Sequence, residues 1–81
     1  MEVREIMIHV RFAPDGTVTE IGERPADLTP QAWFNHLSDQ AGASYQTFAG
    51  GRGVFRLQRD EVDALKPAAQ AEAGGPVEIR I

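Results

Sequence analysis

Hydrophobic and polar residues alternate with a period of two near the N-terminus of the chain. From residue 5 to residue 12, every second position holds an isoleucine, valine or phenylalanine, and polar residues fill most positions between them. This alternation predicts a β-strand with one buried face. The turn sequence Ala13-Pro14-Asp15-Gly16 follows, and residues 17–21 are rich in β-branched side chains, so we expect a β-hairpin. Val18 and Ile21 are three positions apart, which predicts a bulge or an early end of the second strand.

The start of a helix is the clearest local signal in the chain. Thr29 is a suitable N-cap, and Pro30 suits the first helical position, where its missing N–H costs nothing. Leu28 precedes the cap and Trp33 holds the fourth helical position, which is the spacing of a hydrophobic staple. Apolar residues then recur with helical spacing until a glycine follows. The pattern predicts a helix over residues 30–41, with Trp33 in the core or, alternatively, half exposed as an anchor for a partner.

The second half of the chain repeats this order of elements without a match in sequence. Two strands are predicted over residues 44–48 and 54–58, joined by the hairpin loop Ala49-Gly50-Gly51-Arg52-Gly53. Asp60 is a suitable cap for a second helix, which Pro67 is expected to kink or end. Residues 77–81 alternate again and predict a last strand.

These elements predict an α+β fold for one domain covering residues 1–81. The order is ββαββαβ, and we expect a two-layer sandwich in which two helices cover one face of a single mixed sheet. The apolar side of the last strand favours a place inside the sheet, paired with the first strand.

Composition restricts the function more than it reveals it. The 81 residues include no cysteine, which excludes disulfides, thiolate metal sites and a cysteine nucleophile. The net charge of −4 does not favour non-specific binding to nucleic acid or to an anionic membrane. No apolar run approaches the length of a membrane span, and the acidic start is unlike a signal peptide. We therefore expect a bacterial protein of the cytoplasm with no membrane contact.

No pattern in the sequence predicts catalysis, a metal or a cofactor. The two histidines, His9 and His36, lack a third ligand with suitable spacing and are interpreted as surface residues. Neither serine lies in a nucleophile-elbow sequence. The glycine-rich loop lacks the Gly-Lys-Ser/Thr ending of a P-loop, and a strand follows it where phosphate motifs need a helix. It is interpreted as a flexible hairpin tip, with binding of an anion through Arg52 as the alternative.

The face of the sheet opposite the helices carries the most informative side chains. It combines arginine with imidazole, thioether and phenol groups, and residues of these types are enriched at protein interfaces. We expect a non-catalytic module that binds an unknown protein or associates with itself. The alternative is weak binding of anions or single-stranded nucleic acid through the arginines. The candidate binding residues are Met7, His9, Arg11, Tyr45, Arg52, Arg56 and Arg80.

The helix start Leu28-Thr29-Pro30-Gln31-Ala32-Trp33-Phe34 and the hairpin Ala49-Gly50-Gly51-Arg52-Gly53-Val54-Phe55-Arg56-Leu57 also carry a resemblance. Through them the whole chain resembles small uncharacterised proteins encoded in GC-rich proteobacterial genomes. The resemblance implies no activity, and no functional residue is carried over from it.

Overall fold

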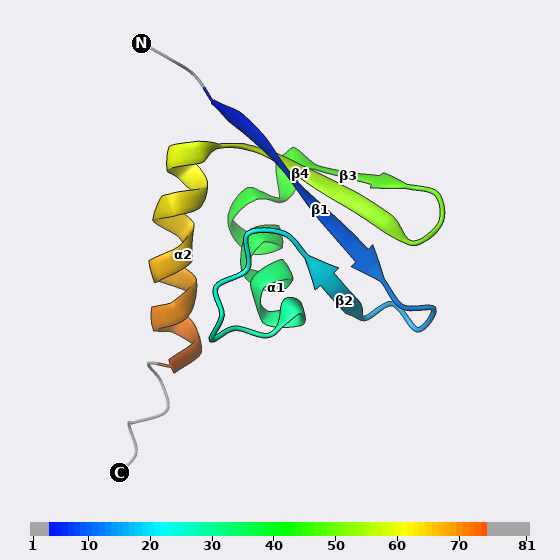
Figure 1. Cartoon of the computed structure of the whole chain (residues 1–81), viewed down its shortest axis with the longest axis horizontal. Helices are drawn as coiled ribbons and strands as arrows, with labels where there is room; N and C mark the ends of the chain where they lie inside the picture. The colour runs from blue at the N-terminus through cyan, green and yellow to red at the C-terminus, as the bar shows by residue number, and fades with distance from the viewer. Residues whose placement is uncertain (1–3, 75–81) are drawn as a thin grey trace.

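The described part of the chain, residues 4–74 of a computed structural model, forms an α+β fold in the order ββαββα (Figure 1). The elements are β1 (Glu5–Phe12), β2 (Val18–Ile21), α1 (Pro30–Ala41), a 3-10 turn (Gly42–Ser44), β3 (Tyr45–Phe48), β4 (Arg52–Gln58) and α2 (Arg59–Gly74). All four strands and both helices within this range were predicted from the sequence. The strand predicted over residues 77–81 lies outside the described residues.

The four described strands form one antiparallel sheet in the order β2-β1-β4-β3. The prediction of a mixed sheet is therefore wrong for these strands. The reason is that β2 and β3, the two strands joined through α1, lie at opposite edges of the sheet and never become neighbours. Each strand instead pairs with a partner that runs in the opposite direction, and β1 and β4 form the centre.

The first hairpin contains the irregularity that the sequence predicts. Arg11 pairs with Glu20 while the next residue, Phe12, pairs with Val18, so one residue of β2 is passed over. The extra residue is Thr19, whose hydroxyl donates to the Arg11 carbonyl at 3.1 Å. The bulge allows both Val18 and Ile21 to be buried despite their spacing of three.

Helix α1 begins as the sequence predicts. The Thr29 hydroxyl accepts a hydrogen bond from the Ala32 N–H at 3.1 Å, which satisfies one of the free donors of the first turn. Leu28 and Trp33 both belong to the core. The C-terminal end differs from a left-handed glycine cap, because Gly42 has a φ of −59° and leads into the 3-10 turn.

Helix α2 continues through Pro67 to Gly74, so the expectation that the proline ends the helix is wrong. Proline removes the hydrogen bond to the carbonyl four residues earlier, which here belongs to Asp63. Both Asp63 and Pro67 lie on the exposed side of α2, where water reaches the freed carbonyl. Val62 and Ala69 on the opposite side are buried, and their packing holds the helix together across the proline. No helix in residues 4–74 is long and apolar enough to cross a membrane.

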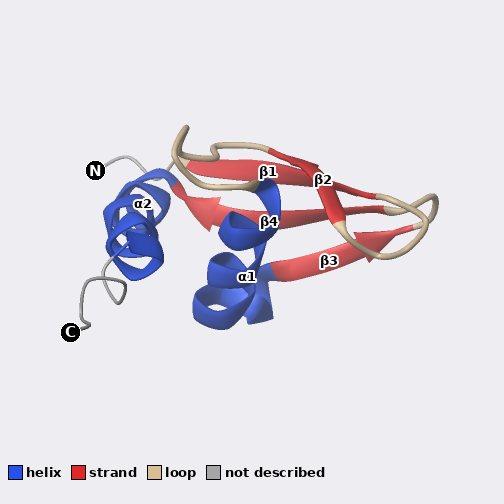
Figure 2. Cartoon of the chain, turned by 90° about the horizontal axis from the view of Figure 1, so that it is seen from below, coloured by secondary structure: helices blue, strands red, loops and turns tan. Residues whose placement is uncertain are grey.

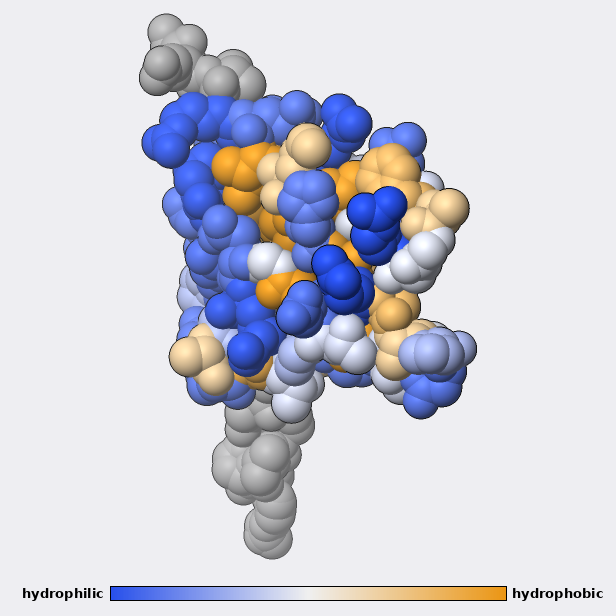
Figure 3. Space-filling model, turned by 45° about the vertical axis from the view of Figure 1, so that its right-hand side comes forward, coloured by the Kyte–Doolittle hydropathy of each residue, from blue (hydrophilic) through white to orange (hydrophobic). Residues whose placement is uncertain are grey.

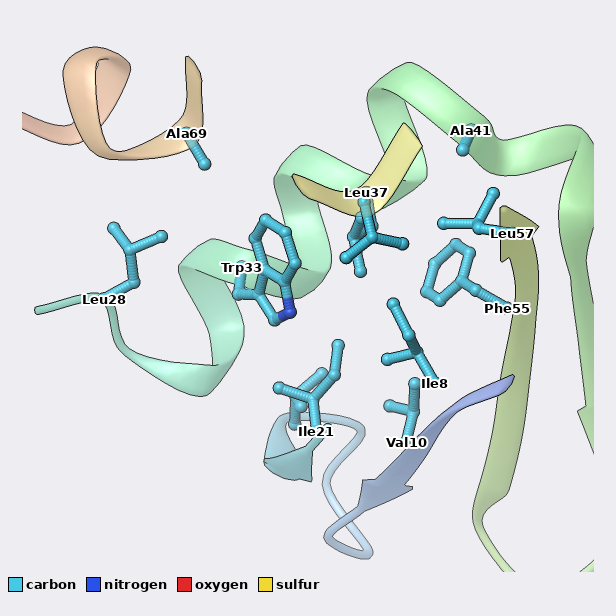
Figure 4. Close-up of a cluster of buried hydrophobic side chains, with 12 residues drawn as sticks. Ile8, Val10, Ile21, Leu28, Trp33, Leu37, Ala41, Phe55, Leu57 and Ala69 are labelled. Atoms are coloured by element: carbon cyan, nitrogen blue, oxygen red, sulfur yellow. The ribbon is translucent and has the colours of Figure 1, made fainter. Parts of the chain in front are cut away.

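The core lies between one face of the sheet and the two helices. Helix α1 packs across this face, and α2 stands at one end of the sheet beside α1 (Figure 2). Trp33 of α1 is fully buried at the centre, between Leu28 and Leu37 and above Ile21 (Figure 4). Its indole N–H donates to the Gly22 carbonyl at 3.0 Å. The alternative of an exposed Trp33 that anchors a partner is therefore wrong.

Candidate interaction surface on the open sheet face

The strand register divides the sheet into a covered face and an open face. Residues that pair across neighbouring strands point their side chains to the same face of the sheet. Successive pairs along the strands alternate between the two faces. Ile8 and its partner Phe55 define the covered face, because both are fully buried in the core. The residue pairs that alternate with this one along the strands form the open face, which no described helix covers. Its residues are Glu5, Met7, His9, Arg11, Glu20, Gln46, Phe48, Arg52, Val54, Arg56 and Gln58.

Three arginines gather on the open face from two neighbouring strands. Arg11 of β1 lies directly opposite Arg52 of β4, and Arg56 lies two open-face pairs further along β4. Arg11 forms an exposed ion pair with Glu20 at 3.5 Å. Arg52 and Arg56 are exposed and form no ion pair with another residue of the described range. A cationic surface therefore lies on a chain whose net charge is −4.

A shallow hollow on this face is framed by polar side chains. It has a volume of about 340 Å³. It is lined by His9, Arg11, Glu20 and Arg52, together with Val10 and Gly53. Arginine presents a planar fork of donors that matches a carboxylate in two-point geometry. The two arginines thus offer donors for a carboxylate in this hollow, and Glu20, which also lines it, already pairs with Arg11.

Apolar surface is mixed with these charges. Met7 is 47% exposed and Phe48 is 44% exposed, and both belong to the open face. Val54, at the centre of the same face between His9 and Gln46, is fully buried. Both described helices lie on the other side, and Val54 is not part of the core cluster beneath them. On the side of the molecule that Figure 3 presents, apolar groups in orange and tan lie among strongly hydrophilic ones in blue.

Tyr45 lies on the covered face and is not part of the open face. Its ring packs against Phe55 and Phe34, with centroid distances of 4.8 and 5.7 Å. The ring occupies the space above Gly53, where an added Cβ would lie 2.1 Å from the tyrosine oxygen. Burial raises the pKa of the Tyr45 phenol, and its hydroxyl has no hydrogen-bond partner. The interpretation of Tyr45 as a candidate binding residue is therefore corrected, because the register pairs it with Phe55 in the core.

The remaining candidate residues divide into two groups. Met7, His9, Arg11 and Arg56 lie on the open face, as the alternation predicts. Arg52 joins them because β4 begins two residues earlier than expected, which removes this arginine from the loop and places it beside Arg11. Arg80 lies outside the described residues.

The sequence analysis did not predict two clusters of polar side chains. His36, interpreted as a surface imidazole, is only 7% exposed, stacks on Trp33, and contacts Glu72 of α2 through Nδ1 at 2.9 Å. Glu23, which the sequence analysis did not single out, binds both Arg59 at 2.7 Å and Lys66 at 2.8 Å. No local pattern could reveal these contacts, since each joins residues at least 36 positions apart.

Within residues 4–74 no three histidine or acidic side chains converge in a way that could hold a metal ion. The glycine loop between β3 and β4 is a tight turn, in which Gly50 and Gly51 have positive φ angles of 84° and 72°. The Gly51 carbonyl accepts a hydrogen bond from the Phe12 N–H at 2.8 Å, which ties the loop to β1.

Comparison with known proteins adds no relative, since no family model, curated protein or solved structure matches the chain. The function is therefore argued from the chemistry of the open face.

Proposed function

We propose that this chain is a protein-interaction module whose open sheet face binds an acidic segment of a partner protein. The observation that carries the proposal is the concentration of Arg11, Arg52 and Arg56 on one face of a chain with a net charge of −4. Two carboxylates, Glu5 and Glu20, share this face, so its own balance is positive. A surface whose charge is opposite to that of the whole molecule favours a negatively charged partner.

The apolar residues of the face favour a polypeptide. Met7 and Phe48 present flexible and aromatic surface beside the arginines, and these residue types are enriched where proteins meet. A partner segment that alternates acidic and apolar side chains would bind both the arginines and these apolar side chains.

Single-stranded nucleic acid fits less well. Sheet platforms for unpaired bases use two or three exposed aromatic rings. Among the described strands, Phe48 is the one exposed aromatic residue of the open face, since Tyr45 packs into the core. The net charge also opposes a polyphosphate chain.

The test is a titration of the ¹⁵N-labelled full chain with a synthetic twelve-residue peptide that alternates glutamate with leucine and phenylalanine. We expect amide shifts concentrated in β1, β3 and β4. Arg56→Gln should weaken binding about tenfold, because a charge-assisted contact is lost. Arg4→Gln is the matched control. It removes the same charge from an exposed arginine whose position in the alternation belongs to the other side of the sheet, and it should change affinity less than twofold.

Two outcomes contradict the proposal. Shifts that avoid the open face, or equal effects of the two substitutions, would show that the peptide binds by net charge alone. Stronger binding of a ten-residue oligothymidylate than of the peptide, with a steep loss of affinity as salt rises, would instead identify the face as a nucleic-acid platform.

A further inference from the structure

A cleft lies between helices α1 and α2, on the side of the sheet opposite the open face. It has a volume of about 340 Å³, near the lower end of the range for sites that bind small molecules. One wall is formed by α1 and the residue before its cap, and the other wall by the C-terminal half of α2. The cleft is therefore separate from the surface that carries the proposed partner-binding function.

The floor of the cleft is apolar. It is formed by Leu28 before the α1 cap, Ala32 of α1 and Ala69 of α2. Leu28 and Ala69 are buried and lie between the start of α1 and the ribbon of α2 (Figure 4). The short side chains of the two alanines leave space between the helices. An alkyl group on this floor would be removed from contact with water, which favours its binding there.

The rim of the cleft is acidic. Asp39 lies on the α1 side and Glu72 on the α2 side, with the amide of Asn35 one helical turn from Asp39, and all three side chains are exposed. Within residues 4–74, neither carboxylate forms an ion pair with a lysine or arginine. Asp39 accepts a hydrogen bond from the side-chain amide of Gln40 at 3.1 Å. The described lining thus combines two carboxylates with an apolar floor and contains no lysine or arginine.

His36 holds one of these carboxylates in place. Its imidazole lines the cleft, is only 7% exposed and contacts the Glu72 carboxylate through Nδ1 at 2.9 Å. Its Nε2 is buried with no hydrogen-bond partner among the described residues, so a hydrogen on Nε2 would be an unsatisfied donor. The neutral imidazole therefore carries its hydrogen on Nδ1 and donates it to Glu72. This bond orients the Glu72 side chain at the rim and leaves its negative charge intact.

We propose that this cleft binds an organic cation that consists of a primary ammonium group on a short alkyl stem. The stem lies on the apolar floor, and the ammonium group lies at the rim with Asp39 and Glu72. Its three N–H donors match the two carboxylates and the Asn35 carbonyl oxygen, which has a second lone pair beside the one that accepts from Gln31 at 3.0 Å. The small volume suits a compact ammonium better than the larger, planar guanidinium. The net charge of −4 also attracts a cation.

The test is a titration of the ¹⁵N-labelled full chain with n-butylammonium chloride. We expect saturable amide shifts in residues 32–39 and 69–72, with a dissociation constant on the order of 1 mM. n-Butanol has the same stem without the charge and should bind at least about tenfold more weakly.

A second compound distinguishes the two sources of such a cation. Nα-acetyl-lysine methylamide carries the same ammonium group and stem on a peptide backbone. If it binds more tightly than butylammonium, the natural ligand is a lysine side chain of a polypeptide. If it binds equally or more weakly, the natural ligand is a free amine.

Matched variants separate the cleft from the overall charge of the chain. Asp39→Asn and Glu72→Gln should each weaken binding of butylammonium about fivefold, since each removes one carboxylate from the rim. Ala32→Leu leaves the charge unchanged and should abolish binding, because the larger side chain fills the cleft. Asp60→Asn is the control, because this exposed acid lies on the same helix about 18 Å from Glu72, and its loss should change affinity less than about twofold.

Several outcomes would overturn the proposal. One is the absence of any saturable shift up to about 50 mM butylammonium. Equal losses of affinity in Asp60→Asn and in the two rim variants would show attraction by net charge alone. Binding of butanol as tight as that of butylammonium would show that the cleft does not recognise the charge. Arg56→Gln lies on the open face and should leave butylammonium binding unchanged, which keeps this test independent of the proposed partner-binding function.

Discussion

The ion cluster around Glu23 gives the sharpest quantitative prediction. Its carboxylate binds Arg59 at 2.7 Å and Lys66 at 2.8 Å, which ties the loop after β2 to α2. The hydrogen bonds from Arg59 and Lys66 lower the pKa of Glu23 from its ordinary 4.5 to about 2. A pKa lowered by this much corresponds to at most about 3 kcal/mol of folding free energy at neutral pH. Because the Glu23 side chain is 30% exposed, water screens the cluster, and we expect about 1–2 kcal/mol.

The substitution Glu23→Gln keeps the shape and the backbone but removes the charge. The lowered pKa stabilises the folded state above pH 4.5, and this contribution is lost as the pH falls from 4.5 to about 2. The variant should therefore be about 1–2 kcal/mol less stable than the parent at pH 7, and the two should become equally stable near pH 2.

Urea unfolding measures this difference, with the fluorescence of Trp33 as the probe, since it is the single tryptophan and is fully buried. Glu20→Gln is the control, because its side chain is 75% exposed and its contact with Arg11 spans 3.5 Å, so its loss should cost less than about 0.5 kcal/mol. A difference between Glu23→Gln and the parent that stays constant from pH 7 to pH 2 would show that the charge of Glu23 does not stabilise the fold.

Four further predictions concern the core and the cap of α1, all measured by the same urea unfolding. Leu37→Ala should cost about 2–5 kcal/mol because Leu37 is fully buried, and a silent change would contradict its place in the core. Thr29→Ala should cost about 1 kcal/mol through loss of the bond from Ala32; a neutral result would mean that the cap is not needed. Tyr45→Phe should leave stability unchanged or raise it, since the hydroxyl is buried without a partner, and a loss above about 1 kcal/mol would reveal an unseen one. Gly53→Ala should cost about 1–3 kcal/mol because its Cβ would overlap the Tyr45 ring, and an unaffected variant would disprove that packing.

Local patterns along the chain were enough to predict the individual helices and strands. The alternation from residue 5 to residue 12 gave β1, and the Thr29–Pro30 start gave α1 with its exact first residue. Both signals depend on neighbours within a few positions, because strand alternation and helix capping are local geometry. The spacing of Val18 and Ile21 predicted the bulge for the same reason. The proline in α2 misled this reasoning, because buried packing of Val62 and Ala69 outweighs one missing hydrogen bond.

The pairs of side chains that meet across the fold could not be predicted from such local patterns. The antiparallel order β2-β1-β4-β3 places Arg11 beside Arg52 and packs the Tyr45 ring in the core. No local pattern in the sequence predicts either contact. A shift of one residue in the pairing register of a strand moves every side chain to the other face, so a small error in register changes a whole surface. The Glu23 cluster depends on the path of the chain after Gly22, where contacts with Trp33 and α2 add to a hydrogen bond within the loop, from the Leu28 N–H to the Pro25 carbonyl.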